Sequence, residues 1–323
     1  MKPQQNMKSM RVAVLIMSTN KEPSITNERG MYETFIKYTQ DNKDSLNHKY
    51  DFYFYYADQT KFAGDYQKDL TYIQSVQSNV YNVYCNVQES IYRTFEKTIF
   101  TFNIMKDYDW YIRITISNFI NIELLDIVLD EMDKSFIYCN AINTIVSDEN
   151  YLNDIYPRGD FYMISDIVKT AILPEANKLL FSDVSLDFKK RCNVIHVDDC
   201  LLGVALIKTF GNTYQDMLKM LKYNFIPRDS IENFDKFAIS SRVKTIPPDE
   251  TYSGYSWEDN EYRRQDYKKM KLLYDNMLLL EYKHISLNDL LIDESVGRPT
   301  IFVQYLNTHL PVIKRYLKNK KRG

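Results

Sequence analysis

The sequence has 323 residues, of which 45% are hydrophobic and 26% are charged, as is typical of a globular protein with a substantial core. The formal net charge of -2 gives no electrostatic case for nucleic acid as a partner. The length fits one large domain with an appendage, or two small domains.

The first ten residues are polar, and the apolar run after them, residues 12–17, is too short for a signal-peptide core or a transmembrane helix. We therefore expect a protein that has no membrane anchor, is not secreted and remains in the cytoplasm. The cysteines show neither a C-x-x-C pair nor regular spacing, which indicates free thiols in a reducing compartment. They are Cys85, Cys139, Cys192 and Cys200.

The first half of the chain alternates between strand and helix patterns. Residues 11–20 read as a buried strand that ends in small polar residues, and residues 25–42 carry apolar side chains at helical spacing. Residues 50–59 are a second, aromatic strand, with Asp58 at its carboxyl end. Residues 79–87 are a third strand, and residues 89–107 a helix with the stripe Ile91, Phe95, Ile99 and Phe102.

A fourth strand at residues 110–116 is followed by a helix at 120–133 and a strand at 134–142. This alternation predicts an α/β fold with a mostly parallel sheet and helices on its faces. In such sheets ligands bind beyond the carboxyl ends of the strands. The positions predicted to meet a ligand there are Ser18, Thr19, Asn20, Asp58, Thr115 and Ser117.

The second half is less regular. Residues 197–211 read as a helix that begins with the acidic pair Asp198 and Asp199, where negative charge suits the positive helix end. A Pro-Pro pair and a glycine make residues 247–256 the expected boundary. We therefore expect a flexible N-terminus (1–10), a main domain (11–246) and a helical C-terminal extension with a basic tail (247–323).

Four motifs follow one another in a characteristic order: ESIYRTFEKT, YDWYIRITISNFIN, YPRGDFYMIS and DDCLLG. Together, over residues 12–203, they resemble the β1,3-galactosyltransferase and Fringe type of glycosyltransferase. ERGMYETF is a weaker match to that family's Arg-rich helix. The resemblance implies the GT-A fold, a Rossmann-like, mostly parallel sheet flanked by helices that binds nucleotide-diphospho-sugars.

The family's strand motif places three carboxylates where this chain has Thr115, Ile116 and Ser117. Hydroxyls do not replace the anionic oxygens that hard divalent cations need, so we expect no metal at this position. Asp107 and Asp109 spell D-x-D, but they precede the strand and lie where the family has a structural Tyr-Asp.

The family's C-terminal metal-binding histidine is also missing, since residues 237–245 contain none. Fixed cations can neutralise a departing diphosphate instead of a metal. Arg113, Arg242 and Lys244 are the candidates. The alternative for Arg242 and Lys244 is that they are surface charges.

The resemblance also assigns roles around the acidic pair. It makes Asp199 the base that deprotonates the acceptor hydroxyl and Asp198 its neighbour that positions the acceptor; a plain helix cap is the alternative. Gly159 and Asp160 fall on the family's turn beneath the donor sugar. Lys97 matches the family's Lys-Thr and is either a donor ligand or a lysine on the helix surface.

The resemblance implies an inverting, metal-independent glycosyltransferase that moves a sugar from a UDP-sugar to a hydroxyl of a glycan or protein. Versions without an anchor and without the carboxylates resemble enzymes of bacteria or of large DNA viruses, and a viral protein would act in the host cytoplasm. Two alternatives stay open: a catalytically degenerate GT-A fold that serves as a carbohydrate-binding or structural protein, and a transferase that binds Mn²⁺ or Mg²⁺ through other ligands. No cofactor and no nucleic acid are expected, and a homo-oligomer is possible.

Overall fold

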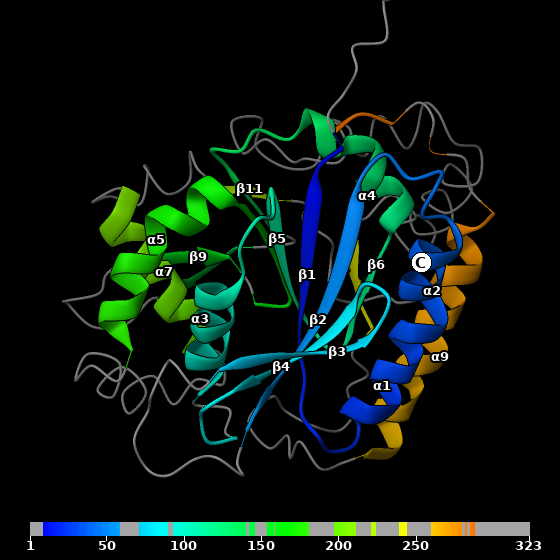
Figure 1. Cartoon of the computed structure of the whole chain (residues 1–323), viewed down its shortest axis with the longest axis horizontal. Coiled ribbons are helices and arrows are strands. Elements are labelled where there is room, and N and C mark those ends of the chain that lie inside the picture. The colour runs from blue at the N-terminus through cyan, green and yellow to red at the C-terminus, as the bar shows by residue number, and fades with distance from the viewer. Residues whose placement is uncertain are drawn as a thin grey trace, which may run out of the picture.

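The computed structural model describes residues 9–58, 71–89, 93–139, 142–145, 154–157, 159–180, 197–210, 221–223, 239–243, 260–279, 282 and 285–287. They form an α/β fold around an eight-stranded sheet in the order β11-β7-β10-β5-β1-β2-β4-β3. Figure 1 shows the sheet in the middle of the molecule, with helices packed on either side of it.

The main sheet contains β1 (Arg11–Met17), β2 (Lys49–Ala57), β3 (Tyr72–Gln77), β4 (Val80–Cys85), β5 (Trp110–Thr115), β7 (Ile137–Cys139), β10 (Phe161–Ser165) and β11 (Leu221–Tyr223). Two further pairs are formed by β6 (Asn118–Ile120) with β12 (Ser240–Arg242), and by β8 (Ile142–Ile145) with β9 (Asp154–Pro157). The helices are α1 (Ser24–Met31), the π-helix η1 (Tyr32–Ile36), α2 (Lys37–Asp41), α3 (Thr94–Ile104), α4 (Ile122–Val128), the 3₁₀ turn η5 (Leu129–Glu131), α5 (Asp166–Leu179), α7 (Val197–Phe210) and α9 (Asn260–Met277).

Strand directions confirm the predicted mostly parallel sheet. β4, β2, β1 and β5 run parallel to one another, and β11 runs parallel to β7. β10 is antiparallel to both of its neighbours, and β3 is antiparallel to β4. The sheet is therefore parallel at its centre, with one reversed strand inserted between β5 and β7.

β1 is buried on both faces. Val12, Val14 and Ile16 point into one hydrophobic cluster, while Ala13 and Leu15 point into a second cluster on the opposite face. Because both faces are covered, the strand reads as a continuous apolar run rather than an alternating one. Each of the valine, leucine and isoleucine side chains contributes about 1.5–3 kcal/mol when fully buried.

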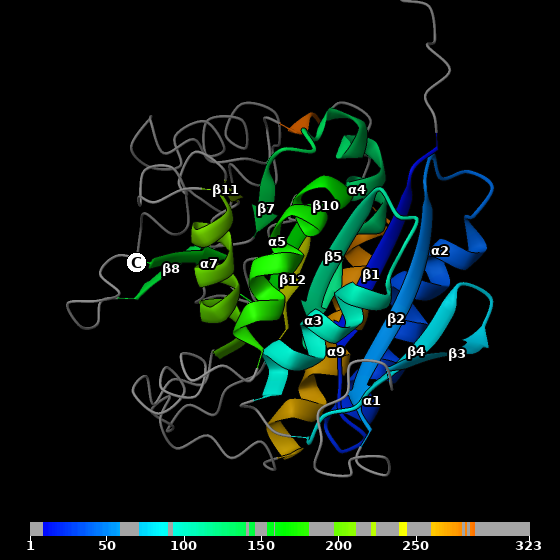
Figure 2. The same cartoon turned by 60° about the vertical axis from the view of Figure 1, so that its left-hand side comes forward.

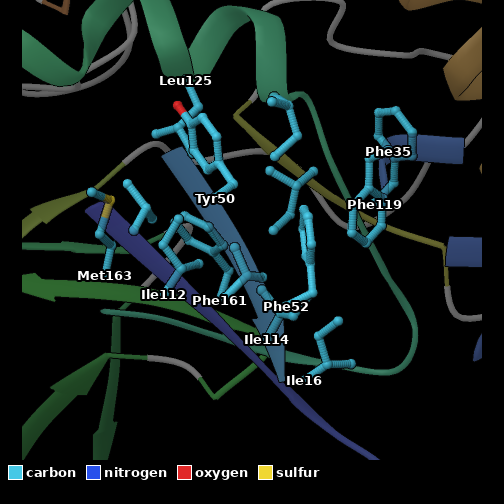
Figure 3. Close-up of a cluster of buried hydrophobic side chains, with 14 of the residues drawn as sticks. Ile16, Phe35, Tyr50, Phe52, Ile112, Ile114, Phe119, Leu125, Phe161 and Met163 are labelled. Atoms are coloured by element: carbon cyan, nitrogen blue, oxygen red, sulfur yellow. The ribbon is translucent and has the colours of Figure 1, made fainter. Parts of the chain in front are cut away.

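The two faces carry different helices. α1, α2, α4 and α9 cover the first face, and α3, α5 and α7 cover the second, as Figures 1 and 2 show. The first cluster has an aromatic and aliphatic centre in which Phe52 of β2, Ile114 of β5 and Phe161 of β10 lie together (Figure 3). The predicted placement of helices on both faces of the sheet is thus confirmed.

α3 is buried almost all round. The predicted stripe residues Phe95, Ile99 and Phe102 are buried as expected, and Ile91 lies outside the described residues. The polar residues between them are buried too, including Glu96 and Lys97. This helix is packed between the sheet on one side and α5 and α7 on the other, so it has no broad solvated face.

The helix predicted at residues 25–42 is present but irregular in its middle. α1 passes into α2 through the π-helix η1, in which Thr34 has φ -118° and ψ -108°. The Thr34 hydroxyl donates to the Gly30 carbonyl at 2.7 Å. Such a bond to a helix carbonyl favours bending, and here it coincides with the π-helical segment.

α9 belongs to the same core as the first strands. Its side chains Met270, Leu273 and Met277 join the first cluster, and Figure 1 shows the helix lying along α1. Asn27 Nδ2 donates to Asp266 Oδ2 at 3.3 Å across this contact, with both residues fully buried. Within the described part of the chain, no helix is both long enough and apolar enough to cross a membrane.

Candidate functional site

The carboxyl ends of β1, β2 and β5 meet at one edge of the sheet. The registers pair Met17 with Tyr55 on one side and with Thr115 on the other. The chain runs from β1 to β2 and β4 on one side, then returns to place β5 on the other side of β1. β1 and β5 therefore flank a topological switch point, the position at which open α/β sheets bind ligands. Of the predicted site residues, Ser18 directly follows β1, Thr115 is the last residue of β5, and Ser117 lies in the turn after it.

Ser18 is buried at this edge and is bonded on both faces of the sheet. Its hydroxyl donates to the carboxylate of Glu28, and its carbonyl accepts from Lys97 Nζ at 3.3 Å. Burial raises the pKa of Glu28, although its bonds to Ser18 and Tyr56 oppose that rise. The next residues turn outward: Thr19 is partly exposed, with its hydroxyl on Ser24 Oγ at 3.0 Å, and Asn20 is exposed.

Lys97 is only 1% exposed, so the interpretation as a lysine on the helix surface is wrong. Its ammonium also donates to Glu89, at 3.0 Å to Oε1 and 3.3 Å to Oε2. The reason for the error is that α3 is covered on nearly every side, so helical position alone did not indicate exposure.

Asp58, which directly follows β2, is buried as well, and its backbone N–H donates to the Cys85 carbonyl at 2.7 Å.

Arg113 lies on the same face of the sheet as α3. Its side chain is 1% exposed, with Nε donating to the Tyr55 hydroxyl at 3.2 Å and Nη2 lying 3.4 Å from Met17 Sδ. The guanidinium carbon is 5.9 Å from the centre of the Tyr162 ring. The guanidinium is therefore buried between the sheet and the helices of the second face. Arg113 lies two residues before the end of β5.

The turn after β5 carries hydroxyl and amide groups that bond to one another. Thr115 Oγ1 donates to Asn118 Oδ1 at 2.7 Å, and Asn118 Nδ2 donates to Ser240 Oγ at 3.1 Å. Ser117 is buried, and its carbonyl accepts from the Val243 N–H at 2.9 Å. These groups do not fit a divalent cation, because they supply no negative charge and their oxygens already have partners.

Two segments distant in sequence close around this turn. Gly159 and Asp160 precede β10 and are buried, and the Asp160 carbonyl accepts from the Thr115 N–H at 3.3 Å. β12 pairs with β6 so that Arg242 lies opposite Asn118. The backbone of five predicted site residues is thus gathered here: Thr115, Ser117, Gly159, Asp160 and Arg242. The side chain of Arg242, and the whole of Lys244, lie outside the described residues.

Two residues of the motif at residues 113–121 have structural roles. Phe119 packs in the first cluster, where its ring meets Phe35 edge-on at 5.9 Å. Asn121 caps α4, since its Oδ1 accepts from the Leu124 N–H at 3.1 Å, and its Nδ2 donates to the Tyr282 hydroxyl at 2.9 Å. Their presence therefore reflects packing and capping as much as any role at the site.

Asp107 and Asp109 lie at the opposite end of the sheet. Asp109 directly precedes β5, where its Oδ2 accepts from the Arg11 N–H at 3.0 Å and its Oδ1 accepts from Lys134 Nζ at 2.7 Å. The location predicted from the sequence, at the strand's entrance, is correct. Among the described residues, no three His, Cys, Asp or Glu side chains form a group that could hold a metal ion.

Asp198 and Asp199 fall in the first turn of α7, which agrees with the predicted helix. Their side chains are outside the described residues, so their roles stay predictions. Two acidic residues that the sequence did not single out do belong to this edge: Glu28 and Glu89. Glu28 stands in ERGMYETF, ten residues after Ser18, and the only signal for it was an acidic residue on the first helix after β1.

Fold and edge together define an α/β protein with a polar site at the switch point of a mostly parallel sheet. No protein-family model matches the chain, and no curated protein does. Among solved structures, the chain is similar to a 4-diphosphocytidyl-2C-methyl-D-erythritol synthase from Anaerococcus prevotii, with 12% identity and a TM-score of 0.29 over 57% of this chain and 84% of that one. It is also similar to a glycosyltransferase involved in glycosylation of the major capsid of PBCV-1, with 7% identity and a TM-score of 0.27 over 58% of this chain and 77% of that one. Identities of 12% and 7% with TM-scores of 0.29 and 0.27 do not assign a function to this chain.

Proposed function

We propose that the protein is a glycosyltransferase that moves a sugar from a nucleotide-sugar, with UDP as the expected nucleotide, to a hydroxyl group of a glycan or protein. The observation that supports the proposal is the switch point between β1 and β5, because residues of three motifs that resemble the GT-A family lie there: Lys97, Thr115 and Asp160. The donor would meet Ser18, Thr19, Asn20 and Asp58 on one side of it, and Thr115, Ser117, Gly159 and Asp160 on the other.

The proposed reaction is a single displacement with inversion. The acceptor oxygen bonds to the anomeric carbon while its proton passes to the carboxylate of Asp199, with Asp198 beside it orienting the acceptor. The bond between the anomeric carbon and the diphosphate oxygen breaks, and its electron pair leaves with the UDP. Arg242 and Lys244 would neutralise that negative charge by direct contact. Arg113, which is buried in β5, would stabilise the charge electrostatically from a greater distance.

A nucleotide titration tests the donor. UDP, UDP-glucose, UDP-galactose and UDP-N-acetylglucosamine should give at least one saturable isotherm by calorimetry. A bound nucleotide should also raise the melting temperature, because it binds only the folded state. If none of the four ligands binds, and no GDP-sugar binds, the result would favour a structural protein. Binding without transfer to any acceptor would favour the degenerate, carbohydrate-binding alternative.

A pair of variants tests the base. Asp199→Asn keeps the shape and capping ability of the side chain but cannot accept a proton, so transfer should fall by about 10²-fold or more while donor affinity changes little. Asp198→Asn is the matched control on the same helix turn, and it should cost less or act on acceptor affinity. Transfer by Asp199→Asn at the parental rate would remove Asp199 from the mechanism.

A further inference from the structure

Ser18 is the first residue after β1, and two charged side chains hold it from opposite faces of the sheet. Glu28 on α1 accepts from its hydroxyl on the first face, while Lys97 on α3 donates to its carbonyl on the second. Its N–H donates to the Tyr55 carbonyl at 3.2 Å. The hydroxyl, the carbonyl and the N–H of Ser18 therefore all have hydrogen-bond partners. These bonds fix the position at which the turn into α1 begins.

The ammonium of Lys97 donates hydrogen bonds to two groups, the Glu89 carboxylate and the Ser18 carbonyl. A lysine has three N–H donors, and the acceptors around Lys97 are Glu89 Oε1, Glu89 Oε2 and the Ser18 carbonyl. A buried ammonium is costly unless a counterion and hydrogen bonds compensate its lost hydration, and here Glu89 supplies the charge. In this arrangement the charge of Lys97 is already paired with Glu89, and its ammonium is directed at Glu89 and the Ser18 carbonyl.

We propose that Lys97 is a positioning residue: it fixes the turn at residues 18–23 through the Ser18 carbonyl, with Glu89 as its counterion, and does not contact the diphosphate. This replaces the direct donor contact that the family resemblance implies for Lys97. The inference rests on the proposed function in one respect, because residues 18–20 are there assigned to the nucleotide.

Lys169 on α5 provides a matched control. It is also buried, it donates to the Met105 carbonyl at 2.7 Å, and it lies 3.3 Å from the carboxylate of Asp166. It packs against the same face of the sheet but near the amino end of β5, where its ammonium bonds the Tyr111 hydroxyl at 2.7 Å. Lys169→Met therefore removes a similar buried cation without touching the proposed site.

Hydrogen exchange tests the positioning role without any ligand. In Lys97→Met, the amides of residues 18–22 should exchange about tenfold faster or more, the factor that corresponds to losing one charged hydrogen bond. Lys169→Met should leave that segment unchanged. If exchange there is unaltered in Lys97→Met, or rises equally in both variants, the proposal is overturned whether or not a nucleotide binds.

Affinities for UDP and uridine separate positioning from direct contact. Lys97→Met should weaken both ligands by the same factor, because the turn is displaced for each; a loss confined to UDP would mean that Lys97 binds the diphosphate. Glu89→Gln covers the case in which Lys97→Met does not fold. It too should leave the ratio of the two affinities unchanged, whereas a selective gain for UDP would show that Glu89 had been masking a phosphate ligand. If the parent protein binds neither ligand, the proposed function fails and the exchange result alone decides the role of Lys97.

Discussion

The contact between α1 and α9 leaves no room for a side chain at Gly30. A Cβ atom there would lie 3.0 Å from Tyr267 Cδ2 and 3.1 Å from Met270 Sδ, well inside the optimal separation of about 3.5–4.0 Å. On an open helix surface, Gly→Ala stabilises by about 1 kcal/mol. Here overpacking opposes that gain with about 1–3 kcal/mol, so Gly30→Ala should be neutral to about 2 kcal/mol destabilising. Gly30→Val, with two further methyl groups, should cost more.

Urea unfolding followed by circular dichroism measures these changes. Ile25→Ala is the control on the same helix, because Ile25 is 51% exposed and its truncation should change the unfolding free energy by less than about 0.5 kcal/mol. In a Met270→Ala background the space opens, and Gly30→Ala should become more favourable by roughly 0.5–3 kcal/mol. The reasoning is refuted if Gly30→Ala alone stabilises by the full 1 kcal/mol expected at an open site.

Three other changes have expected outcomes. Because burial raises the pKa of Glu28 in the folded state, the unfolded chain releases this proton first as pH rises; the parent should therefore lose stability relative to Glu28→Gln as pH increases through the ordinary glutamate range, measured by urea unfolding from pH 4 to 7. Asn121→Ala should cost about 1–2 kcal/mol, since it removes the α4 cap and leaves the Tyr282 hydroxyl without this partner; Asn20→Ala, at an exposed position, is its control. Nucleotide binding and transfer should persist in excess EDTA, and activity that EDTA abolishes and Mn²⁺ restores would show that metal ligands lie elsewhere in the chain.

Sequence reasoning found the central strands because parallel strands covered on both faces are continuous apolar runs. It missed β3, all six of whose residues are exposed, so that only pairing with β4 defines the strand. It also did not predict β10 as a reversed strand between β5 and β7. A five-residue apolar segment carries no signal for its direction, because side-chain alternation is the same either way.

The candidate site was predictable to the extent that it follows strand ends. Ser18, Asp58 and Thr115 could be placed at one edge because the carboxyl ends of parallel strands lie together. The contacts that Lys97 and Glu28 make with Ser18 could not, since they depend on how α3 and α1 are rotated about their axes. A helix buried on nearly all sides shows little periodicity from which that rotation can be read.

The bond between Asn27 and Asp266 joins positions 239 residues apart. At a synthesis rate of about 5–20 residues per second, roughly 12–50 seconds separate the moments at which the ribosome adds the two residues. Throughout that interval, the face of α1 that will later pack against Tyr267 and Met270 has no partner from α9. β1 and α1 are thus completed only after α9, which begins at residue 260, has been made, and contacts between segments so far apart in sequence slow folding.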